Sequence, residues 1–139
     1  MEETKNTSLS LFNENDSNTY CSANVEDIES KKAMYNAITN ADVLLNDCVG
    51  ETIVIKDVYV SKRQVIDEET GEVQDKYQTV LIDTDGKSYA TGSYGVYNSL
   101  RNIFKVFGLP NTWEEPLAFD IRKVKIKNGH EVLKLLLHT

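Results

Sequence analysis

Tyrosines and basic residues are interleaved along the middle of the 139-residue chain. Five tyrosines occur between residues 59 and 97, with lysine or arginine close by in sequence. Aromatic rings provide surfaces on which nucleic-acid bases stack, and cations neutralise the phosphates that connect the bases. Tyrosine suits this role because its ring stacks while its hydroxyl stays in water. The pattern predicts a surface for single-stranded nucleic acid, and the alternative for each tyrosine is a half-buried position in a strand.

Three further lysines alternate near the end of the chain, at positions 123, 125 and 127. Alternate residues of a strand share one face, so these side chains would form a basic stripe. Such a stripe is either a solvated face or a track for a polyanion. Together, the predicted nucleic-acid contacts are Tyr59, Lys62, Arg63, Tyr77, Lys87, Tyr89, Lys123, Lys125 and Lys127.

Residues suited to catalysis are few. The only histidines are His130 and His138, so neither a histidine triad nor a histidine-rich metal site is predicted. Asp83 and Asp85, with the acidic loop at 67–69, form a candidate cation site of the kind found in nucleases. The favoured interpretation is that the first two shape a turn and the loop is solvated. We therefore expect no enzymatic activity and no cofactor.

The negative charge lies mainly at the front of the chain. Residues 1–30 contain one lysine and seven acidic residues, a net charge of -6 out of the total of -7. The remainder can therefore still present a basic face to a polyanion. No apolar run approaches the roughly 20 residues that span a bilayer, which predicts a cytoplasmic protein without membrane contact. Cys21 and Cys48 are expected to be free thiols, with a single disulfide between them as the alternative.

The elements follow from periodicity and turn residues. Residues 1–24 are predicted to be a flexible acidic arm, followed by a helix over 25–38 with Asn24 as its N-cap and a short turn over 42–47. Strands are expected over 51–63, 76–83, 87–91, 117–127 and 130–137. A helix is expected over 94–107, capped by Ser93 and ended by Gly108. Asp85-Gly86 and Asn128-Gly129 are typical hairpin turns.

Three strands, a helix and two strands form the element order of the five-stranded OB-fold barrel. The first strand is apolar on both faces, so it is predicted to bend and pair on two sides. A change of apolar parity after Ile121 predicts a bulge near Arg122. Phe104 and Phe107 are expected in the core, and Trp113 is either a core anchor or an exposed contact. We predict a mostly β chain whose residues 25–139 form an OB-fold that binds single-stranded DNA.

Several segments resemble the small single-stranded DNA-binding proteins of tailed phages that infect Gram-positive bacteria. The resemblance covers roughly residues 30–137. It rests on Tyr35-Asn36-Ala37, Gly50-Glu51-Thr52-Ile53, the Asp85-Gly86-x-x-Tyr89-Ala90-x-x-Ser93 hairpin, Phe119-x-Ile121-x-x-Val124 and Asn128-Gly129. It implies sequence-independent coating of single-stranded DNA in phage replication or recombination, within the host cytoplasm. Position by position, it supports only Tyr89 as a base-stacking residue.

Two other hypotheses come from different classes of protein. The first is an OB-like adaptor, or a DNA mimic that inhibits a host protein, acting through Trp113 and the acidic arm. The second is a metal-dependent nuclease that uses Asp83 and Asp85. Under the main hypothesis the acidic arm is a contact for replication proteins, and the oligomeric state is left open.

Overall fold

The structure is a computed structural model that describes residues 19–23 and 27–139. Within these residues the strands are β1 (Thr19–Cys21), β2 (Val43–Leu44), β3 (Thr52–Ile66), β4 (Val73–Asp83), β5 (Ser88–Thr91), β6 (Leu117–Lys125) and β7 (Glu131–Leu137). The helices are α3 (Ile28–Thr39), α4 (Tyr94–Phe107) and the short 3-10 segments η1 (Leu45–Cys48) and η2 (Pro110–Thr112). The predicted order of three strands, a helix and two strands is confirmed from β3 onward.

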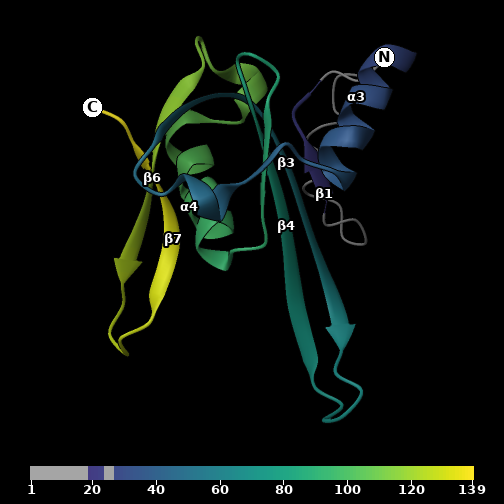
Figure 1. The fold of residues 1–139 in the computed structure, drawn as a ribbon, viewed down its shortest axis with the longest axis vertical. Helices are drawn as coiled ribbons and strands as arrows, with labels where there is room; N and C mark the ends of the chain where they lie inside the picture. Colours follow the sequence, from purple (N-terminus) through teal and green to yellow (C-terminus); the bar gives the residue numbers. More distant parts are fainter. Residues whose placement is uncertain (1–18, 24–26) are drawn as a thin grey trace.

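All the strands belong to one sheet, in which six follow the order β2-β5-β4-β3-β6-β7 and β1 pairs with β3. The sheet curls around α4 as a half-barrel (Figure 1). Strand β3 is shared by its two halves: residues 52–55 pair with β6, and residues 55–66 pair with β4. A register shift between Ile55 and Asp57 gives the bend that this double pairing needs. The predicted bend of the first long strand is therefore confirmed.

The curled sheet is open between β5 and β7. A closed five-stranded barrel would pair these two strands, and within the described residues they are not paired. Helix α4 packs along β7 instead, and the backbone N–H of Leu135 donates to the Ser99 hydroxyl at 3.2 Å. The fold is a mixed α/β arrangement of a curled half-barrel sheet and two helices, so the predicted β-strands are present but the predicted OB-fold barrel is not confirmed.

Strand β6 keeps one register with β7 from Phe119 to Lys125, so the predicted bulge near Arg122 is wrong. Phe119 and Ile121 are fully buried on the face toward the core. Val124 lies on the opposite face and is only partly buried. The parity change therefore reflects apolar residues on both faces of a regular strand.

Helix α4 begins and ends where its capping residues predict. The N–H of Val96 donates to the Ser93 hydroxyl, and Gly108 ends the helix with a positive φ of 85°. Phe104 packs against the core, as predicted. Phe107 is 43% exposed, so its predicted core position is wrong. It lines a surface groove with Leu137 at the end of β7.

The N-terminal part differs from prediction in two places. Thr19 to Cys21, expected in the flexible arm, form β1 against β3, and the Tyr20 ring is fully buried, 5.7 Å from Phe104. Residues 1–18 lie outside the described residues, as does Asn24, the predicted cap of the first helix. Asp27 caps α3 by accepting a hydrogen bond from the N–H of Ser30 at 2.8 Å.

Both cysteines are free, as predicted; both are also buried, and burial raises the pKa of each thiol. No helix in the described part of the chain is long and apolar enough to cross a membrane.

Candidate nucleic-acid interface

Three tyrosines from two elements form one aromatic cluster at the start of α4. The ring of Tyr77 on β4 lies 4.6 Å from that of Tyr97 and 5.3 Å from that of Tyr94, and the two helix tyrosines are 6.2 Å apart. Tyr94 is 54% exposed and the other two are half-buried. The tyrosine cluster therefore presents ring surface to solvent while its members support one another.

The strand register places Tyr77 in this cluster. Tyr77 pairs with Lys62, and the next pairs along the hairpin toward the core on the same face are Val60 with Thr79 and Val58 with Leu81. The core face of the sheet thus continues into the hairpin β3–β4 as a half-exposed surface. We call this the inner face of the hairpin.

The start of α4 is held between two hairpins that extend in the same direction on either side of it (Figure 1). On one side, the α4 tyrosines contact Tyr77. On the other side, Gly95 lies so close to β7 that a Cβ atom there would clash with the carbonyl oxygen of Leu133. Only glycine permits this approach, so Gly95 fixes the distance between the helix start and β7.

Basic side chains flank the tyrosine cluster. Lys62 lies on the inner face beside Tyr77 and is 3.9 Å from the Asp75 carboxylate. Desolvation and the nearby Asp75 carboxylate raise the pKa of the Tyr77 hydroxyl, and the positive charge of Arg101, one turn after Tyr97, opposes the rise. The cluster is therefore neutral, with cations at its border.

The hairpin β6–β7 places two of the three predicted lysines on the side of the sheet that faces the core, the side that also carries Tyr77. Lys123 pairs with Leu133 and Lys125 with Glu131, which continues the face of the buried pair Ile121 and Leu135. Lys127 lies beyond the end of β6, in the turn. The predicted stripe of three therefore consists of two strand residues and one turn residue.

Tyr89 and Lys87 do not join this surface. Tyr89 is 7% exposed within the core, and its hydroxyl donates to Asp83 at 2.9 Å. Burial and this hydrogen bond raise its pKa to about 12. Lys87 lies 5.7 Å from the Tyr89 ring, in the turn that follows Asp83. Asp83 is six residues from Tyr77 along β4, roughly 20 Å at the usual rise of a strand. The Tyr89 ring, predicted as a base-stacking surface, is therefore not exposed for stacking.

Tyr59 and Arg63 lie on the other side of the hairpin β3–β4. Tyr59 pairs with Val80 and Arg63 with Lys76, one residue out of phase with Lys62 and Tyr77. We call this the outer face. Of the predicted set, the structure thus brings Lys62, Tyr77, Lys123 and Lys125 to the accessible part of the core-facing side of the sheet. Tyr89 is on the same side but buried in the core, Tyr59 and Arg63 lie on the outer face, and Lys87 and Lys127 lie in turns.

Asp83 and Asp85, the acidic pair of the nuclease hypothesis, lie in the turn between β4 and β5, where the Asp83 carboxylate is used in hydrogen bonds. The Asp83 carboxylate accepts hydrogen bonds from the N–H groups of Asp85 and Lys87, each at 2.9 Å, and from Tyr89. Partial burial raises the pKa of Asp83, but the hydrogen bonds from Lys87, Tyr89 and Asp85 outweigh it and lower the pKa overall. This is the turn-shaping role that the sequence favoured.

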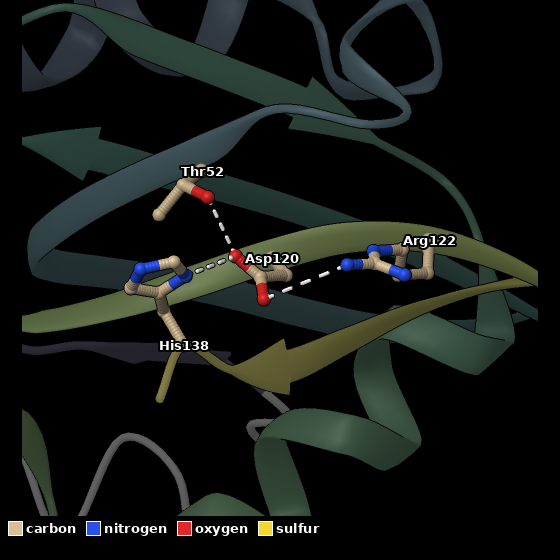
Figure 2. Close-up of polar contacts among 4 residues, drawn as sticks. All are labelled: Thr52, Asp120, Arg122 and His138. Atoms are coloured by element: carbon tan, nitrogen blue, oxygen red, sulfur yellow. Dashed lines mark hydrogen bonds and ion pairs between the residues drawn. The ribbon is translucent and has the colours of Figure 1, made fainter.

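A second polar cluster joins β3, β6 and the residue after β7 (Figure 2). The Thr52 hydroxyl donates to Asp120 Oδ1 at 2.6 Å, and His138 Nδ1 lies 2.9 Å from the same oxygen. Arg122 lies 3.8 Å from Oδ2. The hydrogen bonds from Thr52 and His138 lower the pKa of Asp120. Because the threonine donates to the carboxylate and not to the histidine, the cluster ties strands together and does not activate a nucleophile.

Trp113 is a core anchor. Its indole N–H donates to the carbonyl of Gly108 at 2.8 Å, and its ring packs edge-on against Phe119, 6.3 Å away. This outcome removes the exposed contact on which the adaptor hypothesis relied.

Sequence reasoning left Tyr94, Tyr97 and Arg101 out of the predicted contacts. Their spacing of three and then four residues places them on one helix face, which is a recognisable signal. Only the packing of the helix start against β4 shows that this face continues the Tyr77 surface.

The sequence is similar to known proteins over most of its length. Residues 13–138 match the family model described as phage single-stranded DNA-binding protein. A protein of Bacillus phage GA-1, named single-stranded DNA-binding protein, is 30% identical over 106 residues. The matched region covers 73% of this chain, and the chain spans about 62% of the length of that relative. No solved structure matches significantly.

Proposed function

Because this chain belongs to the phage single-stranded DNA-binding protein family, we propose that it binds single-stranded DNA through the tyrosine cluster of Tyr77, Tyr94 and Tyr97. The observation that carries the proposal is the exposed ring surface at the start of α4, between two hairpins that each place lysine side chains on the same side of the sheet. Each base that stacks on such a ring contributes about 1–3 kcal/mol.

Cations beside the cluster supply the second part of the interaction. Lys62, Lys123 and Lys125 lie on the inner faces of the two hairpins, and Arg101 lies beside Tyr77. Phosphates held by these residues release their counterions, which makes binding depend strongly on salt concentration.

The same chemistry favours single strands of any sequence. Stacking needs bases that are not already paired with a second strand, and each base has a flat face. The cluster has few side-chain groups that read base edges, since each tyrosine offers one hydroxyl. We therefore infer a non-catalytic role in coating single-stranded DNA during phage replication or recombination.

We also infer that the sheet is a variant of the OB-fold. Its pairings β3–β4, β4–β5, β3–β6 and β6–β7 are those of a five-stranded OB barrel, and α4 replaces the closing pair. A contact between the acidic residues 1–18 and replication proteins stays a prediction of the charge pattern alone.

Titration of the protein with fluorescein-labelled poly-dT at two salt concentrations tests the proposal. We expect saturable binding that weakens as salt rises, and weaker binding to a double-stranded competitor than to poly-dT. Binding that is absent, or equal at both salt concentrations, would contradict it.

A further inference from the structure

The outer face of the hairpin β3–β4 carries a second basic site, separate from the tyrosine cluster. Arg63 and Lys76 are directly opposite each other in the strand register, and Ser61 with Gln78 forms the next pair on the same face. These four residues and Tyr77 line a hollow of about 520 Å³. The Gln78 amide closes one side by donating to the carbonyl of Ile38 at the end of α3, at 3.0 Å.

The two cations face each other without a counter-ion. Like charges directly opposite in an antiparallel pair are destabilising. Among the described residues, neither Arg63 nor Lys76 forms an ion pair. The nearest carboxylate in the strand, Asp75, is turned to the inner face, where it meets Lys62. The pairing of Arg63 with Lys76 destabilises the free protein, but it becomes favourable when an anion lies between the two positive charges.

The hollow and the tyrosine cluster meet at one residue. Tyr77 lines the hollow, and its ring belongs to the cluster. Strand β5 pairs with β4 only from Thr79 to Ile82, and Gly92, directly after β5, still lies against the carbonyl of Tyr77. From Lys76 toward the tip of the hairpin, the β4 edge has no described strand beside it, so a nucleic-acid strand can cross there from the inner face to the outer face.

We infer that Arg63 and Lys76 bind the phosphodiester backbone of the same DNA strand whose bases stack on the tyrosine cluster. The strand bends around the edge of β4, with bases on the inner face and phosphates in the outer hollow. The inference rests on the proposed function and adds to it a second contact surface and a path for the strand around the edge of β4. Two phosphates lie within reach of the two cations, which also relieves their mutual repulsion.

The test compares salt dependence for the double variant Arg63→Gln/Lys76→Gln and for the unmodified protein. Each phosphate contact adds about 0.7 to the slope of log K against log salt for a single strand. We expect the double variant to lower this slope by about 1.4 and to shorten the length of poly-dT that each protein covers.

Two matched variants accompany the test. Lys105→Gln/Arg122→Gln removes the same two charges elsewhere, and we expect its slope to stay within about 0.3 of the unmodified value. Arg63→Lys/Lys76→Arg keeps both charges, and we expect it to keep the slope. A thermal melt checks the fold, and we expect the neutral double variant to melt no lower than the unmodified protein, since a repulsion is removed.

The outcomes separate the two proposals. If the unmodified protein does not bind poly-dT, the proposed function fails. If it binds and the Arg63→Gln/Lys76→Gln variant keeps the same slope and covered length, the outer-face site is overturned while the function stands. An equal loss of slope in the Lys105→Gln/Arg122→Gln variant would also overturn it, because the effect would then be one of net charge.

Discussion

At the scale of single residues, the seven tyrosines of the chain have different roles that depend on which face of an element they occupy. Tyr89 lies in the core with its hydroxyl on Asp83, and Tyr77, Tyr94 and Tyr97 share one exposed cluster. Tyr35 lies on α3, 67% exposed, outside any of these ring contacts. Tyr94 in the cluster can therefore be tested for DNA binding, with Tyr35 outside the cluster as the control.

Replacing Tyr94 by alanine should weaken binding of poly-dT by about 1–3 kcal/mol, roughly 5- to 150-fold in Kd, because one stacking surface is lost. Tyr94→Phe should retain most of the affinity, since the ring remains. The control Tyr35→Ala removes a tyrosine that is even more exposed than Tyr94 and should leave Kd unchanged. Fluorescence anisotropy measures all three, and equal losses for Tyr94→Ala and Tyr35→Ala would contradict a specific role for the cluster.

Tyr89→Phe tests the opposite assignment. The variant loses the hydrogen bond to the Asp83 carboxylate and should lower the free energy of unfolding by about 1.5–3 kcal/mol, the value for a bond to a charged group. Urea denaturation measures this change. Affinity for poly-dT should stay the same under conditions where the variant is folded, and a marked loss of affinity with unchanged stability would place Tyr89 at the interface after all.

At the scale of elements, local sequence signals were sufficient for most boundaries. The helix from Tyr94 to Phe107 and the two glycine hairpins follow from caps and turn residues that act within a few positions. Strand β1 could not be predicted in this way, because three residues have no periodicity and Tyr20 is buried only by pairing with β3 and by contact with Phe104. The burial of Tyr89 was missed for a similar reason.

The position of α4 in the open seam also depends on tertiary contacts. Periodicity identifies its apolar face but not whether that face plugs a closed barrel or replaces a pair of strands. Close contact between Gly95 and Leu133, and the hydrogen bond from Leu135 to Ser99, decide the outcome. The tyrosine cluster follows from that docking, which explains why its helix members were left out of the prediction.

Gly95→Ala tests this docking. Alanine favours a helix more than glycine does, by up to about 1 kcal/mol, yet its Cβ would clash with the Leu133 carbonyl and force α4 away from β7. We expect a net loss of about 1–3 kcal/mol in the free energy of unfolding, the usual cost of overpacking. Asn102→Ala, at an exposed position of the same helix, should be neutral or stabilising. Equal stability of the two variants by urea denaturation would show that the helix start is not tightly docked.

At the scale of the whole molecule, stability should fall in acid. Hydrogen bonds to the carboxylates of Asp83 and Asp120 lower their pKa values below the usual 3.8 in the folded state. A lowered pKa means that the ionised form is favoured by folding, so the stabilisation is present above about pH 4 and is lost as pH falls below that value. The urea midpoint should therefore be lower at pH 3 than at pH 6.

The variant Asp83→Asn should show a smaller difference between these two pH values than the unmodified protein, because it has one fewer linked carboxylate. Asp85→Asn is the matched control in the same turn, since its side chain accepts none of the hydrogen bonds of the described turn. A pH dependence that is unchanged in Asp83→Asn would show that other carboxylates carry the acid sensitivity.

The shared strand β3 also has a consequence for synthesis on the ribosome. The second half of β3 can pair with β4 as soon as β4 has been synthesised. Thr52, in the first half, must wait for its partner Asp120, which is 68 residues later in the sequence. Until then the first half of β3 presents an unpaired apolar edge, the kind of surface on which nascent chains aggregate. Closing a loop of this length is also a slow step compared with forming the local hairpin. The pairing of β3 with β6 is therefore the last to form on β3, the strand that joins the two halves of the sheet. The nascent protein is accordingly most exposed to misassembly just before the hairpin β6–β7 is synthesised.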